Sequence, residues 1–225
     1  MKYQQKGFTL VEIAIVLVII GLLLGGVLKG QELINSAKVK NFINDFKSVP
    51  LFIYGYQDKF KALPGDDINY TTHLTAPSGI TLQKASNGTL GNGVIEGNYN
   101  STNATDETVV FWQQVRLANL ASGSADFSTP ANVLPTNADG GHIGVQSAAP
   151  ITGMTGTFFV CSDGILGKFA KQIDLTLDDG NTATGSVQVA AGNSTTYSGT
   201  ALAPVPTTGT SGIVDSNSYI VCMSF

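Results

Sequence analysis

The sequence predicts an α+β protein in which one long N-terminal helix carries a globular domain of mixed helices and strands. Two observations predict this fold class. The first 63 residues combine an apolar run with a longer stripe of apolar residues at helical spacing. Residues 64–225 then hold shorter segments of both helical and strand character, separated by loops rich in Gly, Asn, Ser and Thr. About 165 residues are enough to bury a core of their own.

The apolar run begins at Phe8 and ends at Leu28, which makes 21 residues with one charge, Glu12. A helix of this length can span the hydrocarbon core of a bilayer. An ionised carboxylate near that depth costs roughly 2.5–3.5 kcal/mol on insertion scales. We therefore expect Glu12 to have a partner with a positive charge, for example a new α-amino group at Phe8.

The helix is predicted to continue beyond the apolar run, to about residue 61. Apolar side chains recur there every three or four residues, and Lys and Asp occupy the opposite face. Pro64 and Gly65 end the pattern. The apolar stripe consists of Val39, Phe42, Phe46, Val49, Ile53, Tyr56, Phe60 and Leu63. This spacing predicts that the second half of the helix packs on the globular domain.

Shorter segments of the globular domain alternate between helical and strand patterns. Residues 106–121 and 166–177 have helical spacing, and acidic residues open the first of them. Trp112 lies in this first segment and is expected in the core. Strands are predicted at 156–161, 185–190 and 218–223, and long loops at 69–104 and 191–216.

The N-terminal residues resemble a known signal. Lys6-Gly7-Phe8-Thr9-Leu10-Val11-Glu12, followed by Ile-Ala-Ile-Val-Leu-Val-Ile-Ile-Gly, is similar to the type IV prepilin signal of pilins, pseudopilins and competence pilins. The resemblance implies that a prepilin peptidase cuts between Gly7 and Phe8 on the cytoplasmic side and N-methylates Phe8. It also implies that Glu12 helps a subunit dock on the filament by neutralising the N-terminal amine of its neighbour.

The same resemblance implies a domain organisation and a ladle-shaped type IV pilin fold. Residues 1–7 are then a leader peptide, residues 8–63 the long helix and residues 64–225 an α+β head with a small antiparallel sheet. The helix divides into a transmembrane part, 8–28, and an amphipathic part, 29–63. The precursor is expected in the bacterial inner membrane with its N-terminus in the cytoplasm, and the assembled filament in the periplasm or outside the cell.

An ordinary signal anchor or a secretory signal peptide is the competing interpretation of the N-terminus. A secretory signal has small residues at a cleavage site after its apolar core. Here Lys29-Gly30-Gln31-Glu32 follows the core, and a charge lies within it. The prepilin interpretation therefore accounts for more of the sequence.

Cys161 and Cys222 are the only cysteines. An even pair in a domain that leaves the cytoplasm indicates a disulfide, and disulfides near the C-terminus are common in the family that the N-terminus resembles. The alternative is a pair of free buried thiols.

Composition argues against nucleic acid as a partner. The formal net charge is −4, charged residues make up 12% of the chain, and Arg116 is the single arginine. Nucleic-acid binding depends on many contacts between Lys or Arg and phosphates. Nothing in the sequence points to an enzyme, since His73 and His142 lie in loop-like stretches without clustered partners, and no nucleophile–base motif or zinc spacing is present.

One acidic cluster has the oxygen ligands that calcium prefers. It comprises Asp174, Asp178, Asp179 and Asn181, with Gly180 at the turn. The spacing of a calcium-binding EF-hand loop is missing, and an Asp-Gly turn that joins a helix to a strand also explains the cluster. We therefore expect no cofactor, with calcium as the alternative. Asp66 and Asp67 form a second acidic pair with a weaker claim.

These observations predict a structural subunit of a type IV pilus-like filament. Its expected partners are copies of itself or other pilins, the prepilin peptidase and an inner-membrane assembly platform. One alternative is a minor pilin or type II secretion pseudopilin that primes or tips the filament. Another is a cell-adhesion module that uses the pilin helix for export and binds through the 69–104 and 191–216 loops.

Overall fold

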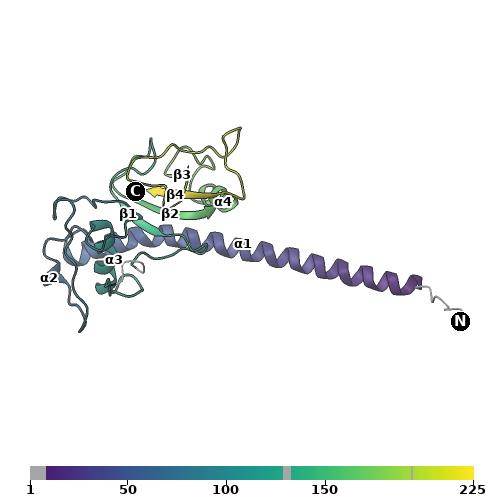
Figure 1. The fold of residues 1–225 in the computed structure, drawn as a ribbon, viewed down its shortest axis with the longest axis horizontal. Coiled ribbons are helices and arrows are strands. Elements are labelled where there is room, and N and C mark those ends of the chain that lie inside the picture. The colour runs from purple at the N-terminus through teal and green to yellow at the C-terminus, as the bar shows by residue number, and fades with distance from the viewer. Residues whose placement is uncertain (1–8, 129–132, 194) are drawn as a thin grey trace, which may run out of the picture. The chain divides into compact units, whose positions relative to one another are not determined.

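The structure is a computed structural model that describes residues 9–128, 133–193 and 195–225. The chain divides into two compact units, residues 1–40 and 41–225. Helix α1, Leu10–Phe60, contributes residues to both units. The two units are described separately below (Figure 1).

In the first unit, α1 is continuously helical, and the glycines at 21, 25, 26 and 30 do not interrupt it. The large apolar side chains between Leu10 and Leu28 are exposed. Within the described part of the chain, α1 is the one helix that is long and apolar enough to cross a membrane. This exposure leaves the apolar surface available to lipid or to other helices.

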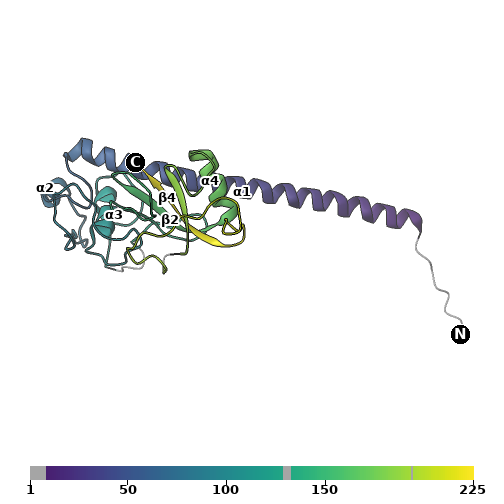
Figure 2. The ribbon, with the colours of Figure 1, turned by 90° about the horizontal axis from the view of Figure 1, so that it is seen from above.

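In its described residues, the second unit contains three further helices: α2, Tyr70–His73, α3, Glu107–Leu117, and α4, Gly167–Leu177. Figure 2 gives a second view of them. Helix α3 is buried from Glu107 to Arg116, and its Trp112 is 3% exposed, which confirms the expected core position. Helix α4 buries Phe169, Ala170 and Ile173 at helical spacing.

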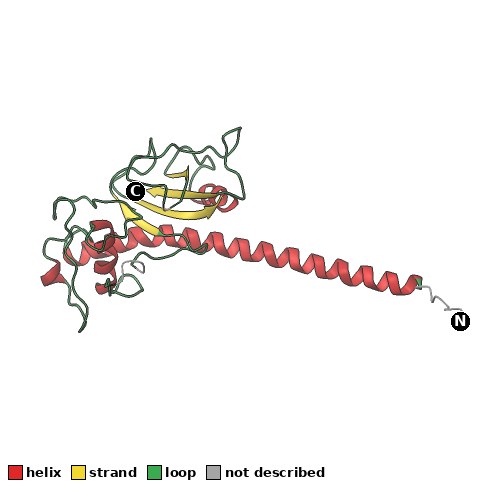
Figure 3. Cartoon of the chain, in the orientation of Figure 1, coloured by secondary structure: helices red, strands yellow, loops and turns green. Residues whose placement is uncertain are grey.

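Among the described residues, four strands form one antiparallel sheet in the order β1-β2-β4-β3. Figure 3 shows the strands in yellow. The strands are β1, Ile143–Gln146, β2, Phe159–Leu166, β3, Val187–Ala191, and β4, Ser218–Ser224. Every neighbouring pair is antiparallel. The register of β2 against β4 shifts between Ser162 and Ile165, where Gly164 has a φ of +70°. The bulge places this residue in the left-handed region of backbone conformation, which glycine adopts without steric cost.

The C-terminal part of α1 buries a row of large apolar side chains in the second unit. Phe42, Phe46, Val49, Ile53 and Tyr56 are each at most 1% exposed, which confirms the predicted stripe. The Phe42 ring lies 6.0 Å from the Phe169 ring of α4, and the Phe52 ring lies 6.5 Å from Trp112 of α3. Phe42 of the stripe therefore packs α1 against α4, and Phe52, beside the stripe, packs α1 against α3.

The α+β class is confirmed: a long N-terminal helix accompanies a small antiparallel sheet. Helices 106–121 and 166–177 are found close to their predicted bounds, as are the strands predicted at 185–190 and 218–223. The strand predicted at 156–161 is displaced: β2 begins at Phe159 and ends at Leu166, because its pairing with β4 continues beyond Ser162. Strand β1 and helix α2 were not predicted. Each has four residues, too few for a periodic pattern, and β1 is defined by its pairing with β2.

Candidate functional site

The N-terminal end of α1 is closed by reciprocal hydrogen bonds between Thr9 and Glu12. The backbone N–H and the hydroxyl of Thr9 each donate to Oε2 of Glu12 at 2.8 Å. The backbone N–H of Glu12 in turn donates to Oγ1 of Thr9 at 3.3 Å. This is a capping box, in which two side chains satisfy N–H groups that have no partner within the helix.

The two donors of Thr9 both hydrogen-bond to the same carboxylate oxygen of Glu12, Oε2. Among the described residues, Oε1 of Glu12 accepts no hydrogen bond, and the side chain is exposed. The capping box thus orients the carboxylate and leaves one oxygen without a partner among the described residues. Gly7 and Phe8, the predicted cleavage and methylation residues, lie outside the described residues.

The role of Thr9 was not predicted. The signal is nevertheless present in the sequence, because Thr-x-x-Glu before an apolar run is the signature of a capping box. The energetic cost of a charge in an apolar segment identifies Glu12, but it does not identify Thr9, the hydrogen-bond partner three residues earlier.

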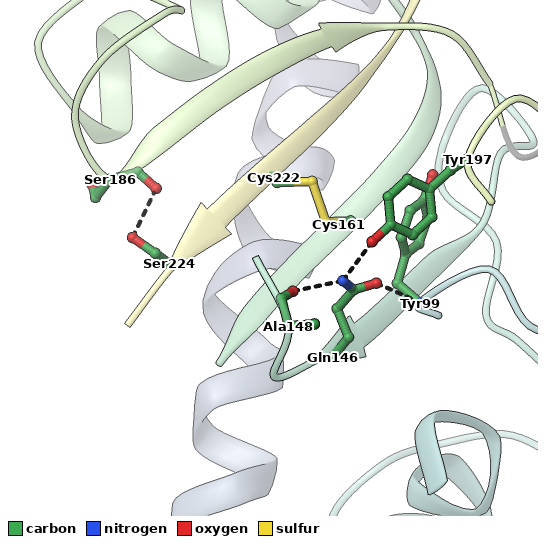
Figure 4. Close-up of a disulfide and its surroundings, with 8 residues drawn as sticks. All are labelled: Tyr99, Gln146, Ala148, Cys161, Ser186, Tyr197, Cys222 and Ser224. Atoms are coloured by element: carbon green, nitrogen blue, oxygen red, sulfur yellow. Dashed lines mark hydrogen bonds between the residues drawn. A yellow bond between two sulfur atoms is a disulfide. The ribbon is translucent and has the colours of Figure 1, made fainter. Parts of the chain in front are cut away.

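Cys161 and Cys222 form a disulfide, as predicted (Figure 4). They are direct partners in the register of β2 against β4, with Cα atoms 4.1 Å apart. Directly opposed residues of neighbouring antiparallel strands come this close where no backbone hydrogen bonds join them. Both cysteines are fully buried in a cluster with Tyr99, Phe159, Tyr197 and Ile220.

Beside the disulfide, Gln146 at the end of β1 joins three segments of the chain (Figure 4). Its amide nitrogen donates to the carbonyl of Ala148 at 2.6 Å and to the hydroxyl of Tyr197 at 2.8 Å. Its amide oxygen accepts a hydrogen bond from the N–H of Tyr99 at 2.9 Å. These bonds hold the two long loops, which carry Tyr99 and Tyr197, against the sheet.

The weaker acidic pair, Asp66 and Asp67, anchors the loop that follows α1. Asp66 accepts hydrogen bonds from the N–H groups of Gly91, Asn92 and Gly93. Asp67 accepts from the hydroxyl of Tyr56 at 2.7 Å and from the N–H of Asn69. Both carboxylates are buried and supplied with donors, so their surroundings indicate a structural role.

The expectation that the two histidines lack clustered partners is wrong. His73 Nδ1 lies 2.7 Å from Oδ2 of Asp67, and His142 Nδ1 lies 3.6 Å from Oδ2 of Asp163. Burial raises the pKa of Asp163 above its usual value, and hydrogen bonding from His142 opposes that rise. The partners are six and 21 residues away, in loops and a bulge that tertiary folding brings together.

The first residue of α3, Glu107, is a fully buried acid. One of its oxygens accepts a hydrogen bond from the N–H of Glu96 at 2.7 Å, and the other has no partner among the described residues. Burial, with the nearby carboxylates of Glu96 and Asp66, raises the pKa of Glu107 to about 8. Glu107 is therefore largely protonated at neutral pH.

Three members of the predicted acidic cluster come together at the end of α4. Asp174, Asp178 and Asp179 each offer an oxygen, and these oxygens lie within 4.8 Å of one another. Burial and the charges of Asp179 and Asp178 raise the pKa of Asp174 to about 7, while the Gly180 N–H lowers it. The side-chain oxygen of Asn181 instead accepts a hydrogen bond from the N–H of Ala183.

Comparison with known proteins identifies one family. Residues 2–28 match the prokaryotic N-terminal methylation motif, and this stretch includes Gly7, Phe8, Thr9 and Glu12. No curated protein matches the chain. The matched residues run from the leader into the apolar half of α1, where the capping box lies. The N-terminus of this chain is therefore a type IV prepilin-like leader.

Proposed function

We propose that this protein is a structural subunit of a type IV pilus-like filament that assembles through its N-terminal helix. The observation that carries the proposal is the methylation motif at residues 2–28, joined to a continuous helix with exposed apolar side chains. Such a motif points to a structural subunit rather than to an enzyme. The buried disulfide fits a domain that works outside the cytoplasm.

Processing comes first in this proposal. The precursor sits in the inner membrane with its N-terminus in the cytoplasm, and the prepilin peptidase cuts between Gly7 and Phe8. Cleavage creates an α-amino group on Phe8, which the enzyme methylates. Removal of Lys2 and Lys6 also takes two positive charges from the chain, whose net charge is −4 before cleavage.

Assembly then uses Glu12. Its other oxygen, Oε1, accepts a hydrogen bond from the N-terminal ammonium of a neighbouring subunit, while Oε2 keeps the hydrogen bonds that Thr9 donates. An ion pair in an apolar environment stabilises only well-placed partners, because a misplaced subunit leaves two charges buried and unpaired. The pair therefore selects one register of stacking.

Three variants separate the charge of Glu12 from its capping role. Glu12→Ala removes both, Glu12→Gln keeps an acceptor for Thr9 but removes the charge, and Thr9→Ala keeps the charge but removes the hydroxyl. We expect all three precursors to be cleaved. Glu12→Ala and Glu12→Gln should lower incorporation into sheared filaments at least tenfold, whereas Thr9→Ala should assemble nearly as well as wild type.

Immunoblots of membrane and filament fractions measure cleavage and incorporation together. If Glu12→Gln entered filaments as well as wild type does, the proposed ion pair would be contradicted. The capping box would not be, because Gln keeps an acceptor for Thr9. Identification of the main protein in purified filaments tests the wider proposal. Dominance of this chain identifies a major subunit, whereas trace amounts would identify a minor pilin or pseudopilin.

A further inference from the structure

A cavity lies between the C-terminal part of α1, α3 and the start of β1, within the second unit. Its volume is about 200 Å³, which is room for about six water molecules. From α1 it is lined by Asp45, Val49 and Phe52, which share one face because they are separated by about one and two helical turns. Trp112 of α3 and Ile143 of β1 line it as well. Among the described lining residues, Asp45 is the one with a charge.

The carboxylate of Asp45 has no hydrogen bond or ion pair among the described residues. The side chain is half-buried, and burial alone raises the pKa of Asp45 to about 6. The carboxyl is therefore still largely ionised at neutral pH. Because a charge removed from water is normally paired or hydrogen-bonded, this cavity lacks a positive partner for Asp45.

Two aromatic side chains line the same cavity. The rings of Phe52 and Trp112 are 6.5 Å apart and inclined at 78°, so they present surfaces in two different planes. The faces of aromatic rings attract cations, and proteins bind quaternary ammonium ions between such rings. The Trp112 ring already has one cation near it, since the guanidinium of Arg116 lies 5.8 Å from its centre. The aromatic walls and the carboxylate thus favour the same kind of ligand.

We propose that this cavity binds a small organic ammonium ion, with Asp45 as its counterion and Phe52 and Trp112 as aromatic walls. A metal ion suits the cavity less well, because one carboxylate supplies few of the six to eight oxygen ligands that calcium takes. The volume restricts the ligand to about the size of six water molecules, which admits a methylated amine and excludes a peptide. The proposal does not depend on filament assembly.

The test uses the full chain in a non-ionic detergent. The probe is choline, and the matched control ligand is dimethylbutanol, its uncharged carbon isostere. Titration calorimetry should show one choline per chain, bound at least tenfold more tightly than dimethylbutanol, because the carboxylate attracts the charge. Trp112 is the single tryptophan, so a change in its emission should accompany binding. Choline at about 100 times its Kd should raise Tm by roughly 5–10 °C.

Two variants separate the carboxylate from the aromatic wall. Asp45→Asn should weaken choline binding at least tenfold and leave the ligand-free Tm equal to wild type or higher, because it removes a half-buried charge. Phe52→Leu keeps an apolar side chain but removes the ring. It should weaken choline binding several-fold and leave dimethylbutanol binding unchanged.

Asp58→Asn, which removes an exposed carboxylate on the same helix, is the matched control and should bind choline as wild type does. Equal affinities of wild type for choline and dimethylbutanol would overturn the proposal. So would undiminished choline binding by Asp45→Asn, or the absence of both heat and a Tm shift in wild type.

Discussion

At the scale of single residues, this protein keeps several acids in places that disfavour their charged form. Glu107 is fully buried and its pKa is raised to about 8, and burial raises the pKa of Asp45 to about 6. Each raised pKa couples the stability of the fold to pH, because the unfolded chain titrates at ordinary values.

The pH dependence of stability is the first prediction at this scale. Glu107 binds its proton more tightly in the folded state than in the unfolded state, where its pKa is about 4.5. Its stabilising contribution is therefore complete below pH 4.5 and is lost as pH rises toward 8. Glu107→Gln should remove this component, which is on the order of 5 kcal/mol from the relation between pKa and free energy.

Urea denaturation of wild type and Glu107→Gln at a series of pH values between 4 and 9 measures the difference. Glu32→Gln is the control, since Glu32 is exposed and pairs with Lys29 on the surface. Parallel stability curves for wild type and Glu107→Gln would show that the buried carboxyl titrates normally.

At the scale of elements, the C-terminal part of α1 and the pairing of β2 with β4 organise the second unit. The buried face of α1 contacts α3 and α4 through aromatic side chains. The outer face of the same helix exposes Leu51 and Tyr54. One helix thus offers buried and exposed positions within one or two residues of each other, such as Ile53 and Tyr54.

Truncation on the two faces of α1 should have very different effects. Phe46→Ala removes a side chain that is 1% exposed and should lower the free energy of unfolding by about 3–5 kcal/mol. Tyr54→Ala removes one that is 56% exposed and should change it by at most about 0.5 kcal/mol. Denaturant titrations of both variants give the comparison, and equal losses would mean that α1 does not pack in solution as described.

The disulfide should stabilise the sheet mainly by restricting the unfolded chain. Cys161 and Cys222 are 61 positions apart, so the double variant Cys161→Ala/Cys222→Ala should be less stable by about 4 kcal/mol. A reducing agent should lower the Tm of wild type and leave that of the double variant unchanged. If reduction left wild type unaffected, the bond would contribute nothing to stability.

At the scale of the whole molecule, a prepilin-like leader and an apolar helix precede a folded domain with its own core. In the proposed function, the leader determines processing and the helix anchors the precursor, while the domain folds around the second part of the same helix. The proposal makes assembly depend on one proteolytic step, because the neighbour's free amine exists only after cleavage.

Blocking that step should hold the whole molecule in its precursor form. Gly7→Leu places a bulky side chain at the cleavage position, so we expect the seven-residue leader to remain and the protein to stay in the membrane fraction. Mass spectrometry of wild type should find N-methylated Phe8 at the new N-terminus. Gly21→Ala, within the apolar run, is the control and should be processed normally. Filaments built from uncleaved Gly7→Leu protein would contradict the proposed order of events.

The sequence by itself determined the features that depend on local pattern. The apolar run is long enough to predict a helix by itself. Helical spacing recurs often enough to predict the second part of α1, α3 and α4. The leader is a contiguous motif, so the sequence alone is enough to identify it. With only two cysteines, Cys161 and Cys222, the disulfide had one pairing available.

The tertiary structure alone decided which polar groups meet. Sequence spacing does not place Glu107 beside Glu96, His142 beside Asp163, or Gln146 beside Tyr197, because loops of irregular length join them. Strand β1 has four residues and exists through its pairing with β2. Burial also decided the state of the acids. Asp66 accepts hydrogen bonds from three backbone N–H groups, whereas the buried Asp174 has one N–H, that of Gly180, and two neighbouring carboxylates. A carboxylate's environment depends on atoms far away in the chain.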